Sequence, residues 1–152
     1  MAKKKRARTR DIVAEGLYIA SAATRLSLKN TILVHILAEG EDFDPERYLP
    51  EARAALEALA AEAEADAART ATERRRARGR HYDSDGTHDY RARDVRNLRR
   101  REKQSLHVAE QLRLRAADDA ELRLLIADAR DAAWGEVAKN IDRTLRIEAS
   151  RP

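Results

Sequence analysis

The sequence contains no cysteine, and only three prolines and five glycines among its 152 residues. Without cysteine the chain cannot form a disulfide, use a thiolate nucleophile or build a cysteine-ligated zinc or iron–sulfur site. Because proline and glycine are scarce, few positions interrupt regular secondary structure. The lack of cysteine is also consistent with a cytoplasmic location, which we expect for this protein.

Aromatic residues and long apolar runs are scarce as well. Aromatic side chains make up 4 % of the chain, whereas charged residues make up 38 %, well above the ~25 % of an ordinary globular domain. No stretch approaches the ~20 uncharged apolar residues that span a bilayer. Asp11 and Glu15 interrupt the apolar run that a secretion signal would need. We therefore expect no membrane partner, and a thin core between long, partly exposed helices.

The pattern that remains is helical, and we predict an all-α fold of four to five helices. No segment alternates apolar and polar residues between turn signals, so no sheet is expected. Apolar helices within 10–39 should pack with a long helical hairpin, whose arms cover about 50–78 and 91–148 and are joined by a loop at 79–90. We expect a basic flexible tail over residues 1–9 and a single helical domain over 10–149.

Capping residues predict where some of these helices begin and end. Asp44 and Pro45 form a helix start, although Pro50 allows the true start to lie nearer 50. Gly40 and Gly79 stand where a helix ends.

Two helix boundaries are less clear from the sequence. Ser27 or Asn30 could cap a second, separate helix within 10–39. Asp118 and Glu121 have the capping-box spacing, which favours a fresh helix from about 119. One continuous helix over 91–148 is the alternative that periodicity leaves open. We expect Trp134 to anchor the last helix on a neighbour.

Charge is sorted into blocks along the chain. Residues 1–10 carry six positive groups and no acid, and residues 74–103 carry eleven arginines and Lys103 against five acids. The intervening segment 39–73 carries eleven acids and three arginines. Such blocks create local fields that select partners whatever the net charge, which is +4 here.

The two basic blocks are the candidate binding residues. If the two helices of the hairpin meet at one end, their arginines converge there, where guanidinium groups could grip phosphates with two bonds each. We expect contacts to nucleic acid from basic side chains of the N-terminal arm and of the two arginine-rich segments: Lys3, Lys4, Lys5, Arg6, Arg74, Arg75, Arg76, Arg78, Arg80, Arg91, Arg93, Arg96, Arg99 and Arg100. The competing interpretation is intramolecular, with the acidic segment 51–73 neutralising part of this charge.

Sites for metals, cofactors and catalysis are not predicted. The segment from His81 to Asp89 holds three carboxylates and two imidazoles, but it fails a calcium-loop pattern at the first and twelfth positions and lacks thiolates for zinc. No phosphate loop, nucleophile elbow or His-Glu-x-x-His motif occurs. We interpret His35 and His107 as core or boundary histidines. We expect neither a metal nor a cofactor, and no enzymatic activity.

The leading hypothesis is therefore a non-catalytic helical protein that binds nucleic acid or another polyanion through arginine-rich surfaces. The alternative is a self-associating structural or adaptor protein, a homo-oligomer whose charges only keep it in solution. The apolar residues of 10–39 would then mark the subunit interface.

Overall fold

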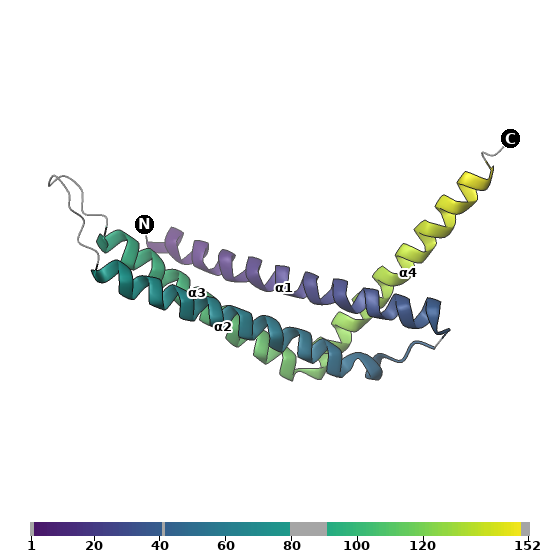
Figure 1. Cartoon of the computed structure of the whole chain (residues 1–152), viewed down its shortest axis with the longest axis horizontal. Coiled ribbons are helices and arrows are strands. Elements are labelled where there is room, and N and C mark those ends of the chain that lie inside the picture. The colour runs from purple at the N-terminus through teal and green to yellow at the C-terminus, as the bar shows by residue number, and fades with distance from the viewer. Residues whose placement is uncertain (1, 41, 80–90, 150–152) are drawn as a thin grey trace. The chain divides into compact units, whose positions relative to one another are not determined.

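The computed structural model describes residues 2–40, 42–79 and 91–149, and for residues 2–9 and 38 it describes the backbone alone. Within these ranges the chain forms helices and no strand, which confirms the all-α prediction (Figure 1). The elements are α1 (Ala2–Ala38), the short 3-10 helix η1 (Pro45–Tyr48), α2 (Leu49–Gly79), α3 (Arg91–Ala117) and α4 (Asp119–Ala149). None of the described helices is long and apolar enough to cross a bilayer.

The contacts within the chain group into two compact units. Unit 1 consists of Met1–Ala20 and Leu56–Leu114, and unit 2 consists of Ser21–Ala55 and Arg115–Pro152. The single helical domain over 10–149 stays a prediction.

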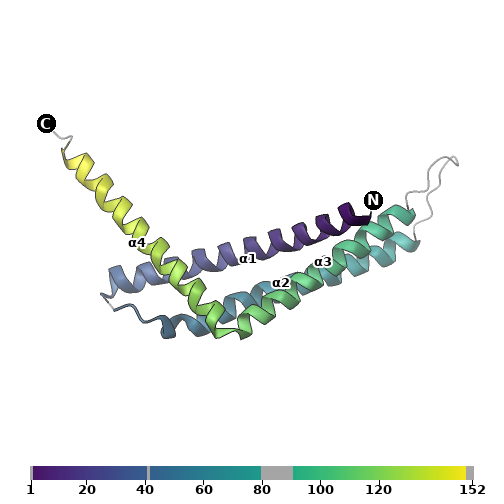
Figure 2. The ribbon, with the colours of Figure 1, turned by 180° about the vertical axis from the view of Figure 1, so that it is seen from behind.

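In unit 1, α2 and α3 form the long antiparallel hairpin that the sequence predicts. Glu64, in the middle of α2, pairs with Arg113, late in α3, at 2.7 Å. Arg74, late in α2, pairs with Glu102, nearer the start of α3, at 2.8 Å. The two helices lie side by side when seen from the front and from behind (Figures 1 and 2). The segment predicted to join them lies, from residue 80 to 90, outside the described residues.

The core of unit 1 is built mainly from small side chains, as the alanine-rich composition predicts. Among the residues of unit 1 whose side chains the structure describes, nine are buried and five of these are alanines: Val13, Ala20, Leu56, Ala60, Ala67, Thr70, Ala77, Ala109 and Leu112. Small residues also let α1 approach α3, because a Cβ added at Gly16 would lie 3.3 Å from a methyl carbon of Val108. Alanines bury little apolar area, so this core gains less from the hydrophobic effect than one of leucines.

Unit 2 has larger buried side chains. Leu28 and Ile32 of α1 and Leu122 and Ile126 of α4 are each fully buried. The hydroxyl of Tyr48, itself buried, lies 3.0 Å from the His35 Nδ1, and the two rings stack with centroids 5.6 Å apart. Phe43 stacks on Tyr48 and Arg130 lies over the Phe43 ring, so unit 2 contains a half-buried aromatic cluster around Tyr48.

The first helix differs from expectation because it is continuous. α1 runs over 37 residues from Ala2, so neither Ser27 nor Asn30 begins a new helix, and the backbone predicted as a tail is helical from its second residue. The hydroxyl of Thr31 donates to a carboxylate oxygen of Glu51 in α2 at 2.7 Å, and it lies 3.3 Å from the carbonyl oxygen of Ser27. Ser27 and Asn30 are therefore interior residues of one helix and cap no new one.

Asp118 separates α3 from α4, which decides between the two alternatives for 91–148. Its carboxylate accepts from the amides of Ala120 at 2.9 Å and Glu121 at 3.3 Å. These are donors that a helix start leaves unpaired. The predicted fresh start near 119 is therefore confirmed.

The other predicted boundaries also have a structural counterpart. Asp44 caps η1, accepting from the amide of Glu46 at 3.0 Å, while α2 begins four residues beyond Pro45, at Leu49. Gly40 adopts a φ of 65°, the left-handed conformation that commonly follows a helix end.

Trp134, which we expected to anchor the last helix on a neighbour, is 49 % exposed. The buried stripe of α4 comprises Leu122, Ile126, Ala129 and Ala133 instead.

Candidate nucleic-acid interface

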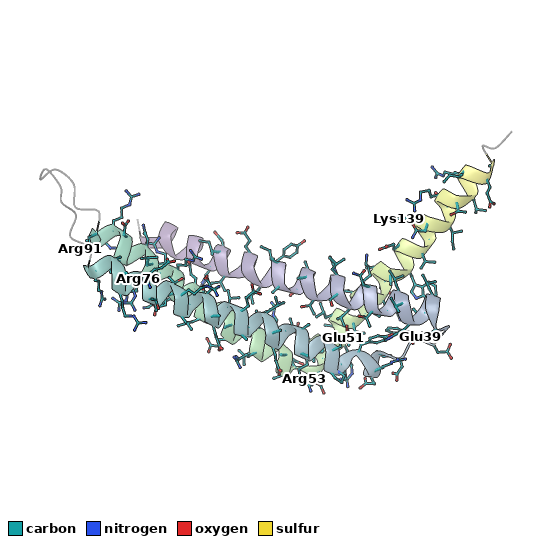
Figure 3. The ribbon with its side chains drawn as sticks, in the orientation of Figure 1. Glu39, Glu51, Arg53, Arg76, Arg91 and Lys139 are labelled. Carbon is teal, nitrogen blue, oxygen red and sulfur yellow. The ribbon has the colours of Figure 1, made fainter. Side chains whose placement is uncertain are left out.

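The arginine-rich ends of α2 and α3 lie at the same end of the hairpin in unit 1. Figure 3 labels Arg76, near the end of α2, and Arg91, at the start of α3, close to each other at that end. Arg75, Arg76 and Arg78 are exposed. Arg91 is half-buried and already has an interaction with the rest of the chain.

Some of the arginines are paired with acids on the other helix of the hairpin, and the pair of Arg101 with Asp66 is the kind that the intramolecular interpretation expects. The half-buried guanidinium of Arg74 donates to both carboxylate oxygens of Glu102, at 2.8 and 3.4 Å. Arg101 donates to Asp66 at 3.0 Å. Arg74 is therefore held within the hairpin and is not part of an outward-facing surface.

Asp66 is the centre of the polar contacts between α2 and α3. Its carboxylate accepts from the Ser105 hydroxyl at 2.9 Å and from Arg101, and Arg69 lies 3.6 Å away. Burial raises the pKa of Asp66, but the hydrogen bonds from Ser105 and Arg101 and the charges of Arg101 and Arg69 outweigh it, so the net pKa is lowered. The folded state thus favours the ionised carboxylate.

Replacing this carboxylate should therefore make the stability less dependent on pH. A pKa that is lower in the folded than in the unfolded state stabilises the fold at pH values above about 3.9, the pKa of an unfolded aspartate. This stabilisation is lost as the pH falls through the pKa of the folded state. We expect Asp66→Asn to unfold at lower urea concentration near neutral pH, with a difference from the wild type that shrinks below about pH 4. Glu64→Gln, at an exposed ion pair, is the control and should change the midpoint less. An Asp66→Asn difference that does not vary with pH would contradict this assignment.

A separate set of cations on α3 forms what we call the basic stripe. It consists of five exposed side chains that share one face of the helix: Arg93, Arg96, Arg99, Arg100 and Lys103. At 100° per residue they cover a sector of about 120° and extend for about 15 Å along the axis. The acids Asp94 and Glu102 fall outside this sector. No described residue forms an ion pair with any of the five.

The basic stripe has an energetic cost that folding does not explain. Five pairs within it stand three or four residues apart, the spacing at which helix side chains are neighbours. Each like-charge pair destabilises a helix by ~0.2–0.5 kcal/mol, which sums to about 1–2.5 kcal/mol. Arg93 also lies in the first turn, where the helix dipole disfavours cations. An anion bound along the stripe would offset these terms.

The exposed arginines of α2 have a simpler explanation. Arg76 and Arg78 lie in the last turn of the helix, where the dipole favours positive charge. They can extend a phosphate-binding surface, but their presence is not by itself evidence for one. The basic stripe is therefore the stronger candidate.

Four of the five residues of the basic stripe are predicted from the sequence, where they are found as a run of positive charge and not as one face of a helix. That prediction missed Lys103, which continues the stripe three and four residues beyond Arg100 and Arg99. A helical period applied to the charged residues would have found it. The side chains of Lys3, Lys4, Lys5 and Arg6 and the whole of Arg80 lie outside the described residues, so their predicted contacts stay predictions.

The comparisons with known proteins add no constraint. Neither protein-family models, nor curated proteins, nor solved structures give a match to this chain. The assignment of function therefore depends on the geometry of the two units.

Other candidate sites contribute little. Among the described residues, no three side chains of His, Asp or Glu come together as a metal site, and the segment 81–89 lies outside them. His35 is half-buried against Tyr48, and His107 is exposed, with its Nδ1 3.4 Å from the carboxylate of Glu110. A surface pocket of about 470 Å³ between α2 and α3 combines Glu73 and Asp94 with Arg76, Ala77, Asn97 and Leu98. Its two carboxylates disfavour an anion there.

Proposed function

We propose that this protein binds nucleic acid, or another polyanion, through the basic stripe of α3 as a non-catalytic binding protein. The observation that carries the proposal is the run of five exposed cations on one helix face with no acid among them. One strand of a duplex presents a negative charge per ~3.4 Å of the axis, so the ~15 Å of the stripe spans about four phosphates of a strand. Arginine binds phosphate with two parallel bonds.

The choice of nucleic acid as the leading polyanion follows from the form of the stripe. A row of cations along a straight helix fits a regularly spaced backbone of phosphates, and phosphate contacts give affinity without sequence selection. Cysteine is absent, which fits a compartment where disulfides are rare, and we place the activity in the cytoplasm.

The test is direct binding of the full chain to nucleic acid. Labelled duplex DNA and single-stranded RNA of equal length are titrated at low salt and the anisotropy is followed, with heparin as a competitor that is not a nucleic acid. We expect binding whose logarithm falls linearly with the logarithm of salt concentration. Complete displacement by heparin at matched charge would indicate a general polyanion site. Failure of every probe to bind at low salt would remove the proposal.

A further inference from the structure

The surface pocket between α2 and α3 lies beside one edge of the basic stripe. Its volume of about 470 Å³ is within the ~300–1,000 Å³ range of small-ligand sites. Asn97 lines the pocket and comes four residues after Arg93 and three before Arg100, the spacings at which helix side chains are neighbours. Arg76, another lining residue, is at the same end of the hairpin (Figure 3). A strand bound along the stripe therefore passes beside the pocket.

Each of the two helices contributes one of its faces to the pocket. The lining residues occupy positions i, i+3 and i+4 on both helices, with Glu73, Arg76 and Ala77 from α2 and Asp94, Asn97 and Leu98 from α3. Ala77 and Leu98 are apolar and at least half-buried. The polar side chains of Glu73, Arg76 and Asn97 are exposed. Apolar residues with a few polar groups around them are the usual composition of a small-ligand site.

The charge of the pocket is opposite to that of the stripe beside it. Glu73 is exposed, and no described residue forms an ion pair with it. The half-buried Asp94 adds a second carboxylate to the lining. Ionised carboxylates only accept hydrogen bonds, and they repel phosphate. The pocket is thus suited to a neutral group with N–H donors, while phosphates stay on the stripe.

A nucleobase is a neutral group of this kind, and guanine matches the pocket best. Its Watson–Crick edge presents two adjacent N–H donors, N1 and the N2 amino group, so one carboxylate can accept two parallel bonds, as it does from arginine. Uracil presents a single N–H between two carbonyl oxygens, which a carboxylate repels. The amide of Asn97 can donate to the guanine O6, and the guanidinium of Arg76 can stack on the ring.

We propose that the pocket holds an unpaired guanine of a single strand whose phosphates follow the basic stripe, with Glu73 accepting from the N1 and N2 donors. The proposal rests on the binding of nucleic acid by the stripe and specifies the form of that nucleic acid. The paired bases of a duplex cannot present this edge, whereas those of a single strand can. The stripe supplies affinity without base selection, and the pocket selects the base.

Anisotropy titrations with the full chain test the choice of base. The probes are a short labelled oligouridylate, the same strand with one central guanosine, and the same strand with inosine at that position, which lacks the N2 amino group. We expect the guanosine strand to bind about tenfold tighter than oligouridylate, with the inosine strand between them. The salt slope should be the same for all three, because their phosphates are the same. Equal affinities with the salt slope retained would overturn the pocket and leave the stripe in place.

Glu73→Gln tests where the base is held. It should reduce the preference for guanosine to about twofold or less, because the amide replaces an acceptor with a donor, while oligouridylate still binds. Glu62→Gln is the matched control, since Glu62 is exposed on nearly the same face of α2, about 16 Å further along the axis, and does not line the pocket. It should keep the full preference. A preference that survives Glu73→Gln, or that Glu62→Gln removes equally, would overturn the assignment.

Free guanosine separates this proposal from the binding of a strand. It carries no phosphate, so its binding does not require the basic stripe. Guanosine added to the full chain should shift the backbone amide NMR signals of Ala77, Asn97 and Leu98, and uridine should not. Guanosine shifts without binding of any strand would remove the stripe as a phosphate site and keep the pocket. Binding of strands without a guanine preference, together with no guanosine shifts, would remove the pocket alone. Failure of both measurements would remove both proposals.

Discussion

Replacing Arg93, Arg96, Arg99 and Arg100 together with alanine should abolish most of the affinity for duplex DNA. Each phosphate contact contributes ~0.9 to the slope of log affinity against log salt, so losing four lowers the slope by ~3.6. At ~0.1 M salt this corresponds to a loss of about 3.6 orders of magnitude, for an unchanged affinity at 1 M salt. Anisotropy titrations at several salt concentrations measure both quantities.

The same variant should not lose stability, which separates a lost contact from a lost fold. Removing the basic stripe relieves like-charge neighbours on α3, so the urea midpoint should stay the same or rise. A matched control removes four arginines from other positions, namely Arg113, Arg123, Arg130 and Arg143. These face Glu64, Glu46, Asp131 and Asn140. Equal losses of affinity in the two variants would mean that net charge, and not the stripe, controls binding.

The largest effect on stability is expected from Ile126→Ala in α4. Ile126 is fully buried in unit 2. Its truncation removes apolar contacts and leaves a cavity, which costs ~2–5 kcal/mol. Domains of this size are stable by only ~5–15 kcal/mol, so the loss is a large part of the total. Chemical denaturation followed by circular dichroism measures it.

Ile141→Ala provides the same substitution on the same helix without burial. Ile141 is 56 % exposed, and changes at such positions usually stay within ~0.5 kcal/mol. If Ile141→Ala lowers the free energy of unfolding as much as Ile126→Ala does, the C-terminal part of α4 is buried against a partner in solution. If neither costs more than ~1 kcal/mol, the unit 2 core is looser than its burial indicates.

Local chemistry explains why several boundaries could be predicted from the sequence. Asp118 and Asp44 cap helices through bonds to amides only two or three residues away, and Gly40 adopts a backbone conformation that glycine tolerates best. Each signal depends on neighbours in sequence. The antiparallel hairpin could be predicted because α2 and α3 are long segments whose apolar residues repeat with the helical period.

The features that could not be predicted depend on contacts between distant residues. Arg74 and Arg101 look like the other arginines in the sequence. Only the register of α2 against α3 places Glu102 and Asp66 opposite them. The same holds for Trp134, whose exposure depends on which turns of α4 have a neighbour. The continuity of α1 was missed because Ser27 and Asn30 are compatible with a cap as well as with a helix interior.

The alanine-rich core of unit 1 affects how that unit moves. Small side chains expose little apolar area to water when two helices separate. Transient opening of α2 from α3 therefore costs less free energy than it would with a core of leucines. Amide hydrogens in such a segment exchange with solvent through these openings. A ligand that binds only the closed hairpin shifts this equilibrium by mass action. Occupancy of the α3 cations would thus slow exchange along α2, a helix that need not touch the ligand at all.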